Sequence, residues 1–260
     1  MTLVLRADSI RKAYGTRAVL NAATLRATAA TLTYLIGRNG CGKSTLLRIA
    51  AGELTPDGGV VSYKGRAALR QRWHRLARDG FSYLPDRDLL SPRRTVRQHL
   101  DAVVAQFRLA GYGSAVETCQ LEALLDARCG ELSTGERRRA EVATILVRRP
   151  DCLLADEPYR HLDPVDRQII AAALREITAQ GCAVVVTGHE VADLVLSVDA
   201  VVWCTDGTTY ELGTPQQALT DWRLVKHYLG EGRASDLLAE LEAMGPPLRP
   251  SETERLGAAE

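Results

Sequence analysis

The chain has 260 residues, an apolar fraction of 46% and a formal net charge of +1. Such a length is enough for one large or two small domains, and the near-neutral charge argues against a dedicated nucleic-acid binder, which normally carries a basic excess. No apolar run approaches the ~18 residues of a membrane span and the N-terminus lacks a signal-peptide pattern, so we expect a soluble protein that is not exported.

Short strands dominate the first third of the chain. They are rich in β-branched or aliphatic residues, and turn residues separate some of them. A helix is expected from about Lys43 to Ala51, and TPDGG (55–59) is expected to form a hairpin turn before the fourth strand. The predicted strands are LVLRADSI (3–10), AVLNAATLRA (18–27), TLTYLIG (31–37), VVSYKG (60–65) and GFSYL (80–84).

The middle of the chain, from about Thr95 to Arg128, changes character. TVRQHLDAVVAQFRLAG (95–111) and SAVETCQLEALLDA (114–127) have apolar residues at helical spacing. We therefore predict a small helical insertion, which ends at LSTGE (132–136).

The last portion alternates between strands and helices. CLLAD (152–156) and CAVVVTG (182–188) are continuous apolar runs, typical of strands covered on both faces. Pro164 begins the segment between them and Gly181 follows it, which predicts a helix and a βαβ unit with parallel strands. The remaining predicted elements are the strands DAVVWC (199–204) and TTYEL (208–212), a short helix SDLLAELEAM (235–244) and a frayed tail (245–260).

GRNGCGKST (37–45) lies between a predicted strand and a predicted helix, and it fits the phosphate-loop pattern G-x-x-x-x-G-K-[ST]. Glycines let the backbone form a nest of N–H donors, and the helix N-terminus adds a partial positive charge. Lys43 is placed to reach the β- and γ-phosphates, and Ser44 offers a hydroxyl to Mg²⁺. The residues of this predicted nucleoside triphosphate site are Gly37, Asn39, Gly40, Cys41, Gly42, Lys43, Ser44 and Thr45.

Two carboxylates follow the apolar strand that begins at Cys152. Asp156 would hold Mg²⁺, usually through a water, and Glu157 is placed to polarise an attacking water. They could instead merely open a polar loop, but the phosphate loop favours the catalytic interpretation. His189 is expected at the same edge of the sheet, where an imidazole can donate to the γ-phosphate or the water. The histidines expected to be structural are His74, His99, His161 and His227.

Five motifs in order resemble those of the ATP-binding cassette (ABC) ATPases. They are GRNGCGKST, LSTGE, LLADEP, HLD and TGH, and the resemblance covers roughly residues 3–230. It implies an α/β fold, a P-loop NTPase core with a mostly parallel sheet, plus an antiparallel β subdomain and a helical subdomain at about 95–130. Residues 1–230 would then form the ATPase domain, and residues 231–260 a short helix and a flexible tail.

The resemblance also implies roles for two residues outside the phosphate loop. Tyr14 aligns with the aromatic residue that stacks on adenine, although it could also be an ordinary tyrosine in a surface turn. Asp163 belongs to the loop after the second motif, which implies a place at the dimer interface.

Ser133 and Glu136 have the spacing of a helix capping box, so LSTGE alone could be an ordinary helix start followed by solvated arginines. In the ABC family, however, two cassettes pack head to tail, and this signature faces the γ-phosphate bound by the other chain. The resemblance therefore implies that Gly135 lets the backbone approach that phosphate and that Ser133 offers a hydroxyl. Thr134 and Glu136 stand where the family often has Gly and Gln.

Asp86, in YLPDRD (83–88), stands where the family usually has a glutamine that reaches Mg²⁺ and the attacking water. Aspartate is shorter and negative, so it would repel free ATP but could bind Mg²⁺ better than an amide. The alternative is that Asp86 points to solvent or pairs with Arg87 or a neighbouring arginine such as Arg93.

The six cysteines include no CxxC pair, which indicates reduced thiols. Cys41 lies in the phosphate loop at a helix N-terminus, a position that tends to lower a thiol pKa. It is either a tolerated small residue or a reactive thiol that bound ATP protects.

Together these features predict an ABC-type ATPase, with ATP and Mg²⁺ as cofactors, that powers a membrane transporter. Since one chain has one phosphate loop and one signature, a second cassette is needed, which we expect to be a copy of the same chain. Transmembrane permease subunits would convert its cycle into transport and hold it on the cytoplasmic face of the membrane. VKHYLGE (225–231) resembles cassettes of branched-chain amino acid importers and lipopolysaccharide exporters, which fixes neither direction nor cargo.

The alternative is a soluble or regulatory ABC ATPase that is not coupled to transport. A chromosome or DNA-repair cassette would need a long insertion where this chain has only residues 46–131, and a translation-factor cassette would carry two cassettes. A regulatory cassette should have lost Lys43, Glu157 or His189, and this chain retains all three.

Overall fold

The computed structural model describes residues 2–67, 73–195 and 198–244. The strands are β1 Leu3–Tyr14, β2 Arg17–Thr28, β3 Thr31–Ile36, β4 Gly58–Tyr63, β5 Arg66–Ala67, β6 Phe81–Leu84, β7 Cys152–Ala155, β8 Ala183–Gly188, β9 Ala200–Thr205 and β10 Thr208–Gly213. Within the described residues they form a six-stranded sheet, ordered β10-β9-β3-β8-β7-β6, and a four-stranded sheet, ordered β2-β1-β4-β5.

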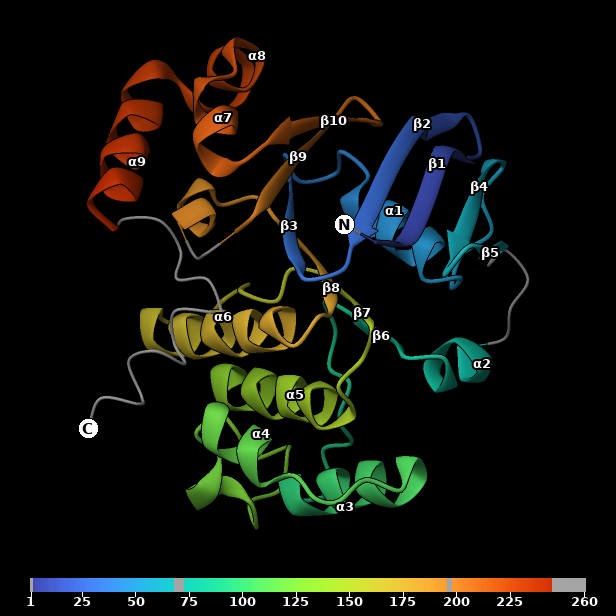
Figure 1. The fold of residues 1–260 in the computed structure, drawn as a ribbon, viewed down its shortest axis with the longest axis vertical. Helices are drawn as coiled ribbons and strands as arrows, with labels where there is room; N and C mark the ends of the chain where they lie inside the picture. The colour runs from blue at the N-terminus through green and yellow to red at the C-terminus, as the bar shows by residue number, and fades with distance from the viewer. Residues whose placement is uncertain (1, 68–72, 196–197, 245–260) are drawn as a thin grey trace.

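The α-helices are α1 Lys43–Ala50, α2 Trp73–Arg78, α3 Val96–Phe107, α4 Gly113–Thr118, α5 Thr134–Arg148, α6 Pro164–Ala179, α7 Pro215–Thr220, α8 Trp222–Leu224 and α9 Glu231–Met244. Among them, α3, α4 and α5 form a group below the sheets, and α7, α8 and α9 form a group at the upper left (Figure 1). Two 3₁₀ turns, η1 (Glu122–Leu124) and η2 (Val191–Val195), and a π-helical turn, η3 (Val225–Leu229), complete the described elements. None of the described helices is long and apolar enough to cross a membrane.

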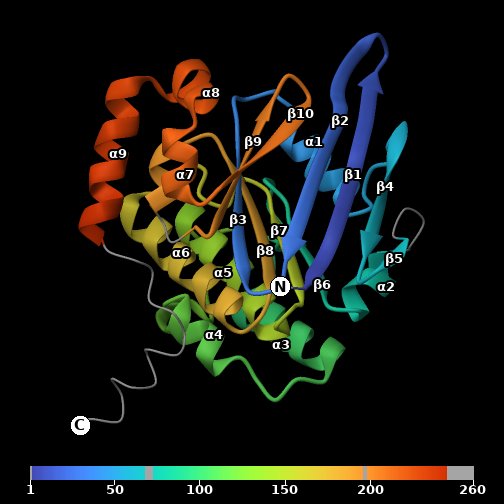
Figure 2. The same ribbon diagram turned by 45° about the horizontal axis from the view of Figure 1, so that its top comes forward.

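The six-stranded sheet is parallel apart from its edge strand β10, which pairs antiparallel with β9. β7, α6 and β8 form the predicted βαβ unit. Successive residues of β7 belong to different core clusters, since Leu153 packs with the helices α5 and α6 and Leu154 packs with α1 and the antiparallel sheet. Both faces are therefore buried, as the continuous apolar runs indicate. Figure 2 shows the layers on either side of the six-stranded sheet, with β1, β2 and β4 on one side and α5 and α6 on the other.

The turn TPDGG (55–59) is not part of a hairpin, contrary to expectation. It connects α1 to β4, and β4 pairs with β1 and then with β5. Asp57 holds this turn to β1, because its carboxylate accepts hydrogen bonds from the backbone N of Ala13, at 2.7 Å, and from Lys12 Nζ, at 2.8 Å. The hairpin lies one strand later, between β4 and β5.

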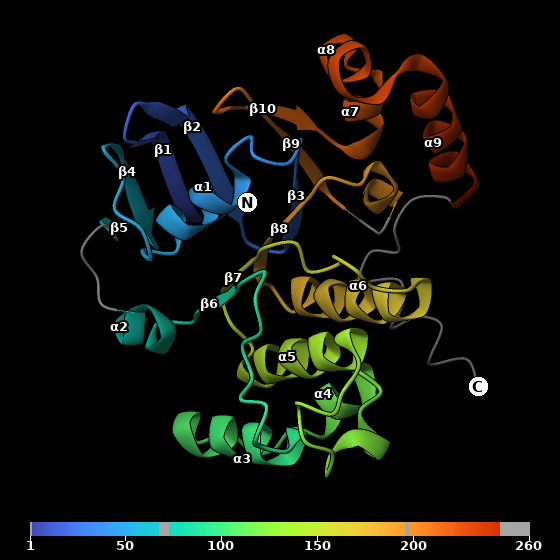
Figure 3. The same ribbon diagram turned by 180° about the vertical axis from the view of Figure 1, so that it is seen from behind.

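The second predicted helix of the insertion is shorter than expected. It ends at Thr118, because Gln120 adopts a left-handed conformation with φ of 51°. The N–H groups of Gln120 and Leu121 bond to the carbonyls of Glu117 and Val116, both at 3.0 Å, which is a Schellman termination. The apolar residues after it continue through η1 rather than a helix. Figure 3 shows α3, α4 and α5 grouped below the sheet.

The C-terminal segment contains more structure than the sequence indicated. After β10 it forms α7, α8 and η3, none of which was predicted, and α9 begins four residues earlier than expected, at Glu231. Ala234 and Leu237 of α9 are buried. Leu237, Leu238 and Leu241 pack in the same core cluster as Leu153 and the helices α5 and α6. The predicted tail at 245–260 lies outside the described residues.

Candidate functional site

The phosphate loop (residues 37–45) follows β3 and ends in the first turn of α1. Gly42 has φ of 111°, and a Cβ there would lie 2.6 Å from Cδ2 of Leu20. A Cβ at Gly37 would lie 2.3 Å from the carbonyl oxygen of Cys204, at the end of β9. Gly42 is therefore required by conformation and packing, and Gly37 by packing alone.

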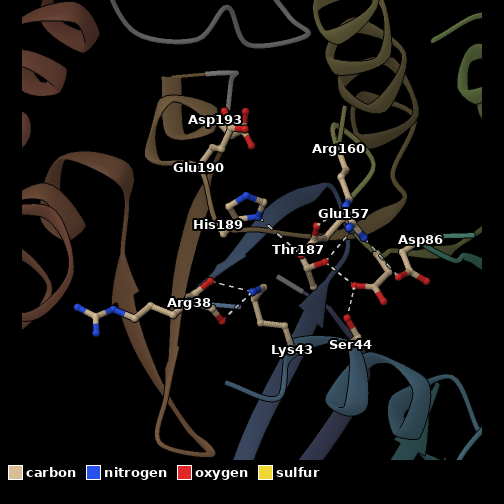
Figure 4. Close-up of polar contacts among 12 residues, drawn as sticks. Arg38, Lys43, Ser44, Asp86, Glu157, Arg160, Thr187, His189, Glu190 and Asp193 are labelled. Carbon is tan, nitrogen blue, oxygen red and sulfur yellow. Dashed lines mark hydrogen bonds and ion pairs between the residues drawn. The ribbon is translucent and has the colours of Figure 1, made fainter. Parts of the chain in front are cut away.

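Lys43 is buried within this loop. Its Nζ donates hydrogen bonds to the carbonyl oxygens of Gly37, at 2.7 Å, and Arg38, at 3.2 Å. An ammonium has three donor hydrogens, so one remains beyond these two bonds. Figure 4 shows the side chain reaching across the loop toward Arg38. Its charge is thus held inside the loop, where an anionic group can be bound.

Asp156, directly after β7, faces Ser44 in the first turn of α1. Its Oδ1 accepts hydrogen bonds from Ser44 Oγ, at 3.0 Å, and from Thr187 Oγ1, at 2.7 Å. Burial raises the pKa of Asp156, and the two hydroxyl hydrogen bonds oppose that rise. Thr187 also accepts a 2.8 Å hydrogen bond from the backbone N of Glu157. Sequence reasoning missed Thr187, although a polar residue at the end of the apolar strand β8 was a usable signal.

The oxygen donors beside Asp156 suit Mg²⁺. Ser44 Oγ and the Asp156 carboxylate are hard ligands 3.0 Å apart. In the part of the chain that the structure describes, no three His, Cys, Asp or Glu side chains gather into a metal-binding group. Mg²⁺ in nucleotide sites takes one or two protein ligands and completes its shell with phosphate oxygens and waters. The pair therefore fits a cation that arrives with a nucleotide.

Glu157 and His189 follow the neighbouring strands β7 and β8, as predicted, and lie close together (Figure 4). His189 Nδ1 is 3.7 Å from Glu157 Oε1 and is buried without a hydrogen-bond partner in the structure. Glu157 has a left-handed backbone with φ of 46°, which is unfavourable for a residue with a side chain. Such strain is found at functional sites, where the surroundings hold it in place. The structure therefore brings a strained carboxylate and an imidazole to the edge of the sheet beside the phosphate loop.

Asp86 lies near this cluster but is about half exposed, with a side-chain exposure of 47%. Its nearest cation is Arg160, whose Nη1 is 4.0 Å from Asp86 Oδ2. The sequence pointed to Arg87 or Arg93 instead, but Arg87 pairs with Glu53, at 3.0 Å. Arg160 Nε is also 3.8 Å from Glu157 Oε2. Sequence reasoning missed Arg160, which places a positive charge between the two carboxylates.

The signature LSTGE forms the capping box that its spacing predicts. Ser133 Oγ accepts from the N–H of Glu136, at 3.1 Å, and Glu136 Oε2 accepts from the N–H of Ser133, at 2.8 Å. Glu136 is therefore turned back toward its own helix start. A Cβ on Gly135 would lie 1.6 Å from Asp166 Oδ2 of α6, so this glycine has a packing cause inside the chain.

The arginines after the signature are not solvated, contrary to the simple helix-start interpretation. Arg137 pairs with Asp88, at 2.8 Å, and Arg138 donates to the carbonyl of Pro85, at 2.9 Å. Arg139 pairs with Asp166, at 2.8 Å. These contacts tie α5 to the loop after β6 and to α6.

Tyr14 and Asp163 lie at the ends of secondary-structure elements. Tyr14 is the last residue of β1, is 47% exposed, and has the ammonium of Lys12 5.9 Å from its ring centroid. An exposed face of this kind is compatible with stacking. Asp163 caps α6 by accepting a 2.9 Å hydrogen bond from the N–H of Asp166.

Cys41 contacts Cys204 of β9. The Cys204 thiol donates to the Cys41 carbonyl at 3.4 Å. The neighbouring Cys204 side chain and the Lys43 charge lower the pKa of Cys41 against the opposing effect of burial. All six cysteines are free, as expected.

A pocket of about 920 Å³ opens beside the first half of the phosphate loop. Its walls are the start of β2, the phosphate-loop residues Arg38–Cys41, the end of β9 with the turn into β10, and four residues after α7. These last four are Trp222, Arg223, His227 and Tyr228. Lys43, Asp156 and Glu157 do not line it, so it flanks the polar cluster.

The ABC transporter family model matches residues 20–160. The Nod factor export ATP-binding protein I of Rhizobium etli is 32% identical over 82% of this chain and 69% of its own length. The lipopolysaccharide export system ATP-binding protein LptB of Escherichia coli is 30% identical over 87% of this chain and 97% of its own.

Solved structures agree in fold. The crystal structure of a nucleotide-free ATP-binding cassette from an ABC transporter superposes with a TM-score of 0.77 at 21% identity, over 88% of this chain and all of that one.

Proposed function

The chain belongs to the ABC transporter family as an ATP-binding, ATP-hydrolysing subunit, and from this premise we propose how its residues share the work. The observation that carries the proposal is the cluster in which Ser44, Asp156 and Thr187 are hydrogen-bonded together beside Glu157. It joins the phosphate loop to the ends of two central strands.

ATP is held mainly by the phosphate loop. The N–H groups of residues 37–45 and the Lys43 ammonium bind the β- and γ-phosphates, and Tyr14 stacks on the adenine. Ser44 and, through a water, Asp156 would hold Mg²⁺, which would supply positive charge to the β- and γ-phosphate oxygens. Asp86 is the weaker candidate for a third ligand, because it is half exposed and lies near Arg160.

Glu157 acts as the general base toward the attacking water. Its strained backbone, bonded through N–H to Thr187, fixes the carboxylate next to the phosphate loop. His189 donates to the γ-phosphate or the water from the other side of the carboxylate. Retention of Lys43, Glu157 and His189 argues against a regulatory cassette without activity.

The complete site is formed by two copies of the chain packed head to tail. Ser133, Thr134, Gly135 and Glu136 face the γ-phosphate bound by the partner copy, and Asp163 lies in the interface. The capping box supports this role, because a helix N-terminus with its acidic side chain turned back still offers N–H groups to an anion.

The dimer is coupled to transmembrane permease subunits on the cytoplasmic face of the membrane. Two of the relatives named above are export proteins, which supports export as the direction. The described site residues suit nucleotide binding, and we assign cargo selection to the membrane partner. Co-purification with a membrane protein encoded nearby tests this part of the proposal, and purification as a free dimer would contradict it.

Mixing two inactive variants tests the shared site. Ser133→Arg should bind ATP but fail to dimerise, and Lys43→Ala should fail to bind ATP. A mixture contains heterodimers with one complete site, made from the phosphate loop of the first variant and the signature of the second. Recovery of ATPase activity in the mixture is expected. No recovery, or ATP-driven dimerisation of Ser133→Arg alone in size-exclusion chromatography, would contradict the arrangement.

A further inference from the structure

The segment VKHYLGE (225–231) was given no role in the site proposed above. It nevertheless contacts both the phosphate loop and the loop that carries His189. Residues 225–229 form the π-helical turn η3, and Gly230, with φ of 81°, ends it before α9. Single π-helical turns are rare and often accompany functional sites. Two neighbouring residues of this turn bond to different loops of the site.

His227 bonds to the phosphate loop. Arg38 Nη2 donates to the His227 carbonyl at 3.0 Å. The carbonyl of Arg38 itself accepts from Lys43 Nζ, at 3.2 Å. The backbone at His227 is therefore held by the side chain of a residue whose carbonyl bonds to the phosphate-binding lysine.

Tyr228 bonds to the loop that carries His189. Its Oη donates to the His189 carbonyl at 2.6 Å, which is a short hydrogen bond. Burial raises the pKa of Tyr228 to about 12, so the hydroxyl remains protonated and can donate at neutral pH. The backbone of His189 is thus fixed from the C-terminal segment.

This backbone bond matters because the imidazole has little else to orient it. His189 Nδ1 makes no hydrogen bond in the structure, and Glu157 Oε1 is 3.7 Å away. Tyr34 anchors the same loop one residue further on, where its hydroxyl lies 2.9 Å from the carbonyl of Glu190. Tyr34 lies in β3, which leads into the phosphate loop, and the Gly37 N–H bonds to the Gly188 carbonyl at 3.3 Å, so these contacts join the two loops along the sheet. The pair His227–Tyr228 joins them a second time, from outside the sheet.

We propose that residues 225–231 form a strap between the phosphate loop and the loop of His189, in which Tyr228 is a positioning residue for His189. The inference rests on the proposed role of His189 in hydrolysis. Through the strap, the side chain of Arg38 and the backbone of His189 are held to adjacent residues, so the strap links the nucleotide-binding loop to the catalytic loop. In this arrangement Tyr228 acts through His189.

Steady-state ATPase kinetics of four variants test the strap. Tyr228→Phe removes one oxygen and should lower kcat about 3- to 10-fold, the size of one lost hydrogen bond, with KM for ATP within about twofold. His189→Ala should lower kcat about 10²–10³-fold, as loss of one transition-state donor does. The double variant should match His189→Ala, because Tyr228 acts through the residue already removed.

Tyr63→Phe is the matched control. Tyr63 Oη donates to the Asp79 carbonyl at 2.9 Å, in the antiparallel sheet away from the site, so the same kind of bond is lost. Both tyrosine variants should lower Tm by about 2–4 °C, and only Tyr228→Phe should lower kcat. A wild-type kcat for Tyr228→Phe, or a loss that multiplies with that of His189→Ala, would overturn the strap while leaving the proposed function intact. Wild-type activity of His189→Ala would remove both the role of His189 and the inference built on it.

Discussion

The Nδ1 atom of His189 lies 3.7 Å from Oε1 of Glu157, too far for a hydrogen bond. Arg160 Nε lies 3.8 Å from the other carboxylate oxygen of Glu157. Each oxygen of the carboxylate therefore has a nitrogen nearby, but neither oxygen makes a hydrogen bond to that nitrogen. Catalytic contacts are often this long before substrate binds and tighten in the complex, so Glu157 keeps both oxygens available to a water.

Glu157→Gln should leave ATP binding intact and abolish most turnover. Loss of a general base costs about 10²–10⁴-fold in rate. The variant should accumulate as an ATP-bound dimer in size-exclusion chromatography, because closure no longer ends in hydrolysis. Hydrolysis at the wild-type rate would remove Glu157 from this role.

Asp86→Ala and Asp86→Gln separate two roles for Asp86. If Asp86 binds Mg²⁺, alanine weakens Mg·ATP binding and turnover and leaves or improves Mg-free ATP binding, while glutamine restores much of the activity. The Arg160 guanidinium 4.0 Å from Asp86 favours the alternative, an ion pair at the rim. Half-exposed pairs of this kind contribute about 1 kcal/mol or less. An unchanged Mg²⁺ titration of ATPase activity in Asp86→Ala would exclude the metal role.

Alkylation of Cys41 should be fast near neutral pH. Its lowered pKa gives a larger fraction of the reactive thiolate at that pH than an ordinary thiol of pKa about 8.5 has. The rate of iodoacetamide labelling, followed by mass spectrometry, should rise with pH to a half-maximum below that of an ordinary thiol. Bound ATP should slow it and block the loss of activity.

Cys204→Ala is the control for that titration. It removes the thiol that bonds to Cys41, so the half-maximum should move to higher pH. Equal labelling with and without ATP, or a half-maximum unaffected by Cys204→Ala, would favour a merely tolerated cysteine.

Asp156→Asn should raise Tm while it abolishes Mg²⁺-dependent hydrolysis. Burial raises the pKa of Asp156, so its ionised form costs stability at neutral pH, and that cost disappears as pH falls through the raised pKa. Asparagine keeps an acceptor for Ser44 and Thr187 without the charge. Thermal unfolding without nucleotide or Mg²⁺ measures the effect.

Asp57→Asn should lower Tm, the opposite of the effect expected for Asp156→Asn. The hydrogen bond from Lys12 lowers the pKa of Asp57, so its ionised form stabilises the fold at neutral pH and that stability is lost as pH falls through the lowered pKa. For Asp156→Asn, in contrast, a lower Tm would contradict the prediction and would mean that the buried carboxylate is needed for stability.

The sequence was most informative where one local pattern has one physical cause. The phosphate loop could be predicted because Gly37 and Gly42 permit close packing that other residues would prevent. The central strands could be predicted because burial on both faces leaves continuous apolar runs. The capping box of Ser133 could be predicted from spacing alone.

Other features depend on partners far apart in sequence. The bond of Thr187 to Asp156 and the approach of Arg160 to Asp86 exist only after the strands are aligned. The arginines of α5 resemble a solvated helix start locally, but the loop after β6 covers Arg138. The short elements between β10 and α9 are too brief for a periodic signal.

The contacts of α5 have a consequence for how two bound ATP molecules affect each other. Arg138 joins α5 to Pro85, next to Asp86, and Arg139 joins it to Asp166 in the first turn that Asp163 caps. In the proposed dimer, the start of α5 faces the nucleotide of the partner copy, while the loop of Asp86 belongs to the site of its own chain. Occupancy of one site would therefore shift the free energy of the other, and linkage requires that shift to be reciprocal. We expect ATP to bind the dimer with positive cooperativity, and Arg139→Gln to lower the Hill coefficient.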